Sequence, residues 1–325
     1  MTRFQRLTGV FITALYVVIS GGSAYAQSTT SATANGFRIS PIRNEVTVEK
    51  GKSATVSIMV ENPSSLPFKA KAVINDFVAS DKEDGEPRLL LDGTSAPSHS
   101  LRKLVQDIPN IDFAPNERKE IPVTITIPTN AAAGGYYGAV RFLPANSTNG
   151  SNINLAASVG SLFLVNVPGN IKEHLFLEQF GAAVSGTIKN IITGGQVSII
   201  TRLKNDGDTH EKPFGKIQIK DSKGKLIVEQ EINNDEPRAN ILPNSIRKFE
   251  TKISNKKWLG HYTVTGSFGY EPSSGDLINA KTSFWYIPIW LLIAFFVIVI
   301  AIIVAGYTVY HKAQMRRHHR NSQKP

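Results

Sequence analysis

The sequence predicts an all-β protein in which two β-sandwich domains follow one another and a single transmembrane helix comes near the C-terminus. Short runs of alternating apolar and polar residues recur between residues 37 and 285, separated by Pro, Gly, Asn and Asp. This pattern is typical of antiparallel strands with one buried face. The order of strand and turn signals occurs twice, and an uncharged apolar stretch follows the second copy.

The first 26 residues have the features of a secretion signal. Two arginines precede a short apolar run, and residues 24–26 read Ala-Tyr-Ala, the small-x-small pattern of a signal-peptidase site. The apolar run is short for a membrane span, which disfavours an uncleaved anchor. We therefore expect residues 1–26 to be removed, Gln27 to begin the mature chain, and residues 27–36 to form a flexible polar leader.

A second apolar stretch is long enough to cross a membrane. Residues 287–309 carry no charge, and a helix of this length, at ~1.5 Å per residue, extends about 35 Å. Aromatic residues flank it at both ends, as at membrane interfaces. We expect a span over 286–310 and a basic cytoplasmic tail over 311–325, which places the sandwiches outside the cell as parts of a single-pass cell-membrane protein.

The formal net charge of +10 comes mainly from the two ends of the chain. Of the 36 Lys and Arg residues, two lie in the signal and five in the tail, which leaves 29 against 26 Asp and Glu. Such a distribution reports topology and does not predict nucleic-acid binding. The chain has no cysteine, so thiol chemistry is excluded and apolar cores must stabilise both domains.

The repeat divides the outer region into domains 37–172 and 173–285. In each half an alternating strand ends in an asparagine, Asn62 or Asn205, and turn residues follow. Further along, each half has a Pro-Asn turn and then, about 20 residues later, a Gly-x-Tyr that opens another alternating strand. Because these signals recur in the same order, we expect the same fold twice.

The tyrosines of the Gly-x-Tyr signals, Tyr136 and Tyr262, are predicted to be structural. A tyrosine at the start of a late strand, after a glycine turn, is typical of the tyrosine corner of immunoglobulin-like sandwiches. Its ring packs inward and its hydroxyl bonds an upstream backbone group. Tyr137 falls on the opposite, outward face beside Arg141, and is therefore a candidate contact residue.

The first half exceeds the second by a charged, Gly- and Pro-containing excursion over residues 81–107. Loops carry binding functions more often than strands do, so the excursion is a candidate contact surface, while a solvated connector is the alternative. Together with the outward face of the Gly-Tyr strand, it supplies these candidate binding residues: Tyr137, Arg141, Arg88, His99 and Arg102.

The sequence contains no recognisable catalytic or metal-binding motif. The histidines outside the predicted span and tail are widely separated, and none has zinc-ligand spacing. Acidic clusters occur, but no calcium-loop pattern is present. We therefore predict no enzyme activity, no metal and no cofactor. A hydrolase of the cell envelope would require a convergent pair of acids, which sequence spacing alone does not reveal.

Over nearly its full length the chain resembles the WxL-interacting protein family of Gram-positive cell surfaces. The resemblance is carried by the order of the parts and by four segments: GFRISPIRNEVTVEKGKSATVSIMVENPS, SLRKLV, APNERKEIPVTITIP and AGGYYGAVRF. It implies a peptidoglycan-binding first domain and a bridging role between surface proteins and the wall. The second domain departs from the family pattern and is only immunoglobulin-like.

These observations predict a non-enzymatic, membrane-anchored surface protein. Its expected partner is peptidoglycan or another surface protein, contacted through the first domain. The alternative is an assembly or chaperone-like protein that accepts a strand of a client at a sheet edge.

Overall fold

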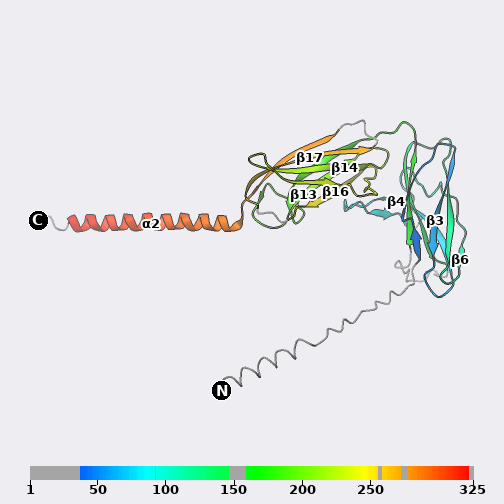
Figure 1. Cartoon of the computed structure of the whole chain (residues 1–325), viewed down its shortest axis with the longest axis horizontal. Coiled ribbons are helices and arrows are strands. Elements are labelled where there is room, and N and C mark those ends of the chain that lie inside the picture. The colour runs from blue at the N-terminus through cyan, green and yellow to red at the C-terminus, as the bar shows by residue number, and fades with distance from the viewer. Residues whose placement is uncertain (1–36, 92, 146–158, 255–257, 272–276, 322–325) are drawn as a thin grey trace, which may run out of the picture. The chain divides into compact units, whose positions relative to one another are not determined.

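Alternating apolar and polar residues form mainly antiparallel strands through both predicted domains (Figure 1). The computed structural model describes residues 37–91, 93–145, 159–254, 258–271 and 277–321. The predicted signal and leader, and the last four residues of the predicted tail, lie outside the described residues. The all-β class, the immunoglobulin-like sandwiches and the C-terminal apolar helix are confirmed.

The first sandwich consists of two sheets whose inner faces share one core. One sheet has the order β1-β3-β7 and the other β2-β9-β8-β4-β5, with β6 beside β4. Phe142, Phe163 and Ile58 are among the fully buried core residues. The strands are β1 (Arg38–Ser40), β2 (Arg43–Thr47), β3 (Ser53–Glu61), β4 (Phe68–Ala79), β5 (Pro87–Leu89), β6 (Ile111–Phe113), β7 (Arg118–Thr126), β8 (Gly134–Pro144) and β9 (Val159–Val167).

The second sandwich repeats this two-layer plan with a separate core. Its sheets have the orders β11-β10-β13-β16 and β12-β18-β17-β14-β15. Trp258, Phe268 and Phe284 pack between them. The strands are β10 (Leu175–Val184), β11 (Thr187–Ile188), β12 (Ile191–Ile192), β13 (Val197–Asn205), β14 (Lys212–Asp221), β15 (Leu226–Ile232), β16 (Ser245–Lys252), β17 (Gly260–Glu271) and β18 (Ile278–Tyr286).

The helix α2 (Ile289–Asn321) starts later than predicted and continues further (Figure 1). Tyr286 still belongs to β18, and Pro288 stands just before the first helical residue, a place that suits a residue without a backbone N–H. The part of α2 from Ile289 to Lys312 is long and apolar enough to cross a membrane. The helix then runs on into the basic residues that were expected to form the tail.

The two asparagines of the repeat make equivalent hydrogen bonds in the two sandwiches. Asn62 Nδ2 donates to the carbonyls of Leu66 and Ala114, at 2.8 and 2.9 Å. Asn205 Nδ2 donates to the carbonyls of Thr209 and Ile241, at 2.7 and 2.9 Å. In each case the side-chain oxygen accepts a backbone N–H two residues on. One buried amide thus fixes a turn and ties it to a second loop.

The tyrosines predicted to be structural lie in the two cores, each two residues after a glycine with positive φ. The Tyr136 hydroxyl donates to the Ala132 carbonyl at 3.0 Å. The Tyr262 hydroxyl donates to the Leu259 carbonyl at 3.1 Å and accepts the Leu259 N–H. Gly134 and Gly260 have φ values of 127° and 98°, which other residues rarely adopt.

Replacing the buried amide should destabilise the second sandwich. Asn205→Ala removes three hydrogen bonds and leaves two buried carbonyls without a donor, so we expect a loss of about 2–4 kcal/mol in the free energy of unfolding. Urea unfolding followed by tryptophan fluorescence measures this, because all three tryptophans lie after residue 257. Asn279→Ala, at an exposed position, is the control, and an equal effect of both substitutions would contradict the assigned role.

Candidate functional site

The outward face of β8 is covered, and the cover comes in part from the second sandwich. Tyr137 is only 8% exposed. It packs with Phe77 and Leu164, and partly buried Leu242 joins this cluster from the second sandwich. Both sandwiches belong to one compact unit, Gly36–Pro325. Tyr137 is therefore not exposed to solvent as expected, because the second sandwich covers this face of β8.

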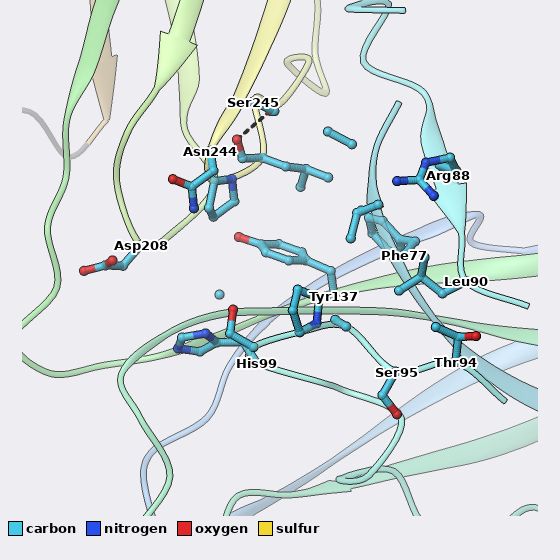
Figure 2. A pocket seen from close by; sticks show the side chains of 18 of the residues that line it. Phe77, Arg88, Leu90, Thr94, Ser95, His99, Tyr137, Asp208, Asn244 and Ser245 are labelled. Atoms are coloured by element: carbon cyan, nitrogen blue, oxygen red, sulfur yellow. Dashed lines mark hydrogen bonds between the residues drawn. The ribbon is translucent and has the colours of Figure 1, made fainter. Parts of the chain in front are cut away.

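A cleft of about 560 Å³ lies beside Tyr137 (Figure 2). Its walls come from the end of β4, from loop residues 90 and 94–99 and from the second sandwich at 207–208 and 242–245. In Figure 2, Arg88 and Phe77 lie to one side of the Tyr137 ring and Asp208 to the other. The lining combines an apolar floor with hydroxyl, amide and charged groups.

One buried carboxylate holds the loop that forms the cleft wall. Asp76 lies at the end of β4 and is fully buried. Its two oxygens accept the Ala96 N–H at 2.8 Å, the Ser100 hydroxyl at 2.6 Å and the Arg102 N–H at 2.8 Å. Bonds from backbone N–H groups to a charged acceptor are strong and directional. The loop is therefore a fixed wall, anchored from within the sheet.

The charged start of the excursion contacts the second sandwich. Glu83 forms an ion pair with Arg202 of β13, which lowers the pKa of Glu83. The Glu83 carbonyl accepts the N–H of Lys248 in β16 at 2.8 Å. Further along, Leu101 and Val105 enter the first core. The excursion therefore bonds the second sandwich and also forms a wall of the cleft. It is not a solvated connector, and its role in binding stays a prediction.

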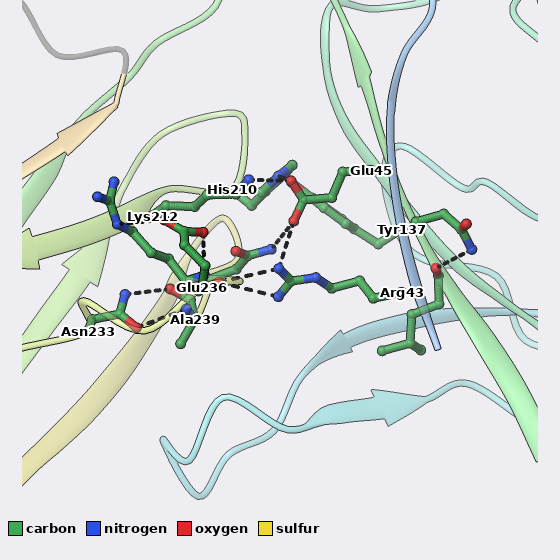
Figure 3. A network of polar contacts seen from close by, with 12 residues as sticks. Arg43, Glu45, Tyr137, His210, Lys212, Asn233, Glu236 and Ala239 are labelled. Atoms are coloured by element: carbon green, nitrogen blue, oxygen red, sulfur yellow. Dashed lines mark hydrogen bonds and ion pairs between the residues drawn. The ribbon is translucent and has the colours of Figure 1, made fainter. Parts of the chain in front are cut away.

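A second set of polar contacts centres on Glu45 of β2 (Figure 3). Its carboxylate faces His210 at 4.0 Å, pairs with the ammonium of Lys212 and accepts from Asn240 at 3.3 Å. Arg43 lies 3.2 Å away on the same strand. His210, Lys212 and Asn240 hold the pKa of Glu45 well below its usual range. His210 Nδ1 also meets the Tyr137 hydroxyl at 3.3 Å, which links this network to the cleft.

Glu211, next to His210, has the opposite environment. It is fully buried, and neither carboxylate oxygen has a hydrogen-bond partner. Burial, with a smaller contribution from the Glu173 charge, raises the pKa of Glu211 to about 8. Removing a carboxylate from water without a partner disfavours the charged form. At neutral pH Glu211 is therefore mainly protonated, close to the contact between the sandwiches.

The structure brings some of the predicted binding residues together and separates others. Tyr137, Arg88 and His99 line the cleft. Arg141 donates to Asn75 at 3.0 Å, and Asn75 in turn donates to the Leu90 carbonyl, so Arg141 supports the loop from behind. The Arg102 guanidinium turns to the Gly93 carbonyl and does not line the cleft.

His99 has a structural part as well. Its Nε2 lies 3.1 Å from the Ala133 carbonyl, and its ring meets Tyr136 edge-on at 4.8 Å. It therefore links the cleft wall to the glycine turn before β8. A histidine with positive φ is uncommon, and here the contacts on both sides hold it in place.

Sequence analysis did not identify the site residues that come from outward strand faces and turns of the two domains. Glu45, His210, Lys212 and Asn240 read as ordinary polar positions of solvated strands and loops. Apart from the Arg43–Glu45 pair within β2, their contacts in this network come from the meeting of the two sandwiches, and no local sequence pattern indicates that meeting.

The arrangement is suited to binding. Clefts of 300–1,000 Å³ with an apolar floor and a few fixed polar groups typically hold small or extended ligands. Within the described parts of the chain, no group of three or more His, Asp or Glu side chains could hold a metal ion.

No family model and no curated protein matches this chain. Among solved structures, the class 5 fimbriae chaperone CfaA is 15% identical and has a TM-score of 0.37, covering 76% of this chain and 99% of its own. A chaperone–tip subunit complex of Csu pili from Acinetobacter baumannii is 12% identical with a TM-score of 0.32, covering 66% and 89%. The CupB2 chaperone of Pseudomonas aeruginosa is 11% identical with a TM-score of 0.31, covering 75% and 98%. The tip subunit in the Csu complex is a partner of that chaperone.

Glu211 should make stability depend on pH. Between about pH 5 and 8 the folded protein keeps the Glu211 proton, whereas the unfolded chain releases it near the ordinary pKa of 4.5. The folded state then binds more protons, so the free energy of unfolding should fall as pH rises, by about 2–4 kcal/mol over this window. Urea unfolding at several pH values measures the slope.

In the same experiment Glu211→Gln should flatten the slope, and Glu229→Gln, at the protein surface, should leave it unchanged. A wild-type slope that survives in Glu211→Gln would show that another group is responsible.

Proposed function

We propose that this protein is a single-pass envelope protein that binds an extended segment of another surface protein at the open edge of β9. The observation that carries the proposal is the length of the strand beside β9. β2 pairs with β9 only from Leu162 to Asn166, whereas β9 begins at Val159. Because β2 runs parallel to β9, residues 159–161 lie opposite the segment that precedes β2, where Ser161 Oγ donates to the Pro41 carbonyl but no strand among the described residues pairs with this edge of β9.

The unpaired edge carries free backbone groups. The Leu162 N–H donates to the Ile42 carbonyl and the Asn166 carbonyl accepts from Val48, so alternate residues of β9 point toward β2. By this alternation the N–H and C=O of Gly160 point to the same side, at a level of the sheet where β2 has not yet begun. Exposed backbone groups of this kind are the usual template for adding a strand.

An apolar side chain lies next to the open edge. Ile42, which bonds Leu162, is 71% exposed. Strand addition draws affinity from main-chain hydrogen bonds and specificity from side-chain contacts. Ile42 supplies such a contact at the position where the main-chain template starts.

Other long edges are protected. β7 has Pro122 on its free side, where a missing N–H prevents pairing, and residues 104–106 bond its last part. β16 is bonded at Lys248 by Glu83. β15 carries Glu229 and Glu231, charges that discourage strand addition.

Anchoring follows from α2. A span from Ile289 to Lys312 would hold both sandwiches at one side of the membrane, and the basic residues after it favour the cytoplasmic side for the C-terminal end. The binding edge would then face the cell exterior.

Cross-linking in intact cells tests the proposed edge. A photoreactive amino acid in place of Ile42 should give a discrete adduct with one protein, because it stands beside the open backbone of β9. The matched control places the same group at Leu226, which is 45% exposed in the second sandwich. Identical adducts from both positions, or none from position 42, would contradict the edge as the binding site.

A second candidate function is binding of peptidoglycan in the cleft, as the family resemblance implies. It is favoured by one observation: three of the five predicted binding residues, Tyr137, Arg88 and His99, line the same cleft. Arg88 and the serine and threonine hydroxyls of residues 94–98 would donate to sugar or peptide-stem oxygens.

Retention of the detergent-solubilised chain on insoluble peptidoglycan tests the cleft. Arg88→Ala should weaken the affinity for peptidoglycan about tenfold or more, since a hydrogen bond from a charged donor is worth roughly 1.5–3 kcal/mol. Arg118→Ala, an exposed arginine on β7, is the control. Deleting residues 81–107 is a poor test because it removes Leu101 and Val105 from the core. Equal retention of wild type and Arg88→Ala would exclude the cleft.

A further inference from the structure

Three large apolar side chains are exposed together at one end of the second sandwich. Ile191, Leu259 and Trp285 are 59%, 58% and 51% exposed. Ile191 of β12 pairs with Trp285 of β18, and Gly260, the residue after Leu259, pairs with Tyr286. Three separate segments thus place these side chains at the same end of one sheet. We call Ile191, Leu259 and Trp285 the apolar end.

The apolar end lies directly before the predicted span. Trp285 is four residues from Ile289, so it stands within about 14 Å of the first turn of α2 even if the chain is fully extended. The connection is also bonded. The N–H groups of Ile287 and Ile289 donate to the carbonyls of Ile192 and Thr193, at 2.8 and 3.1 Å. The segment with Ile191 is therefore held against the start of the helix.

Above the apolar end, a polar groove on the outer face of the sheet has no acid in its lining. A groove of about 570 Å³ is lined by Asn190, His261, Thr263, Lys281, Thr282, Ser283 and Trp285. The His261 ring lies 5.1 Å from that of Trp285. Lys281 is exposed, and Lys189 is exposed nearby on the segment before β12. Cations and hydroxyl donors suit the phosphates of lipid headgroups.

We propose that the apolar end and the groove beside it form a membrane-contacting surface, with the three apolar side chains in the interfacial layer and Lys281 among anionic headgroups. The proposal rests on the membrane anchoring of α2 proposed above. The apolar groups are already within reach of the bilayer, and the cations near them have no competing carboxylate in the groove. The second sandwich would then be held at the lipid surface as well as tethered to it.

Single labels can test this contact because the chain has no cysteine. We would label Ile191→Cys, Leu259→Cys and, as control, Leu226→Cys on β15 of the same sheet, each in the full chain. The chains are placed in nanodiscs of phosphatidylcholine and phosphatidylglycerol that carry a nitroxide at the headgroup. Quenching of a fluorophore at 191 and 259 should exceed that at 226 by about threefold or more. Equal quenching at all three positions would overturn the proposal.

Charge is tested separately. Lys281→Gln in the Leu259→Cys chain should reduce headgroup quenching about twofold or more in anionic nanodiscs and little in purely zwitterionic ones. One lysine near an anionic surface changes the binding constant roughly fivefold. Lys225→Gln is the matched control. No effect of Lys281→Gln in anionic discs would overturn the headgroup contact. Failure of the unlabelled chain to co-elute with nanodiscs would instead count against the anchoring.

Discussion

A carboxylate at the edge of the first sandwich organises the contact between the two domains. Glu45 faces a histidine, a lysine and an asparagine of the second sandwich, and the histidine continues the chain of contacts to Tyr137. Removing one partner from such a group leaves a charge with too few contacts, which costs more than the bond itself. The cleft, its walls and the burial of Tyr137 all depend on the two domains keeping this contact.

The excursion of the first domain and the Glu45 network act together at the same contact. Asp76 fixes one end of the excursion within the sheet, and Glu83 bonds β13 and β16 at its other end. A loop that would otherwise be solvated is therefore bonded at both ends. Beside these charged contacts lies Glu211, whose carboxyl oxygens have no hydrogen-bond partner. The same region therefore contains Glu45, whose pKa is lowered, and Glu211, whose pKa is raised.

The sequence predicted the elements much better than the contacts between them. Period-two alternation marked the strands because each sheet has one buried face. The repeated asparagine could be found because a buried amide that caps a turn leaves a local signature. The covered face of Tyr137 left none, since a tyrosine suits both water and a half-apolar contact. The predicted start of the span, Tyr286, lies three residues before the observed start of α2, Ile289. Hydropathy alone does not show whether Tyr286 ends a strand or begins a helix.

The bonded passage from β18 into α2 has a mechanical consequence. Only Ile287 and Pro288 separate the strand from the helix, and Ile287 bonds β12, which runs parallel to β18. Tension pulling the sandwich away from the bilayer would load these hydrogen bonds along the strand direction, in shear, before any slack could be taken up. The second sandwich is thus coupled stiffly to α2, and if α2 spans a membrane as proposed, a force on the sandwich would be transmitted to the lipid with little extension.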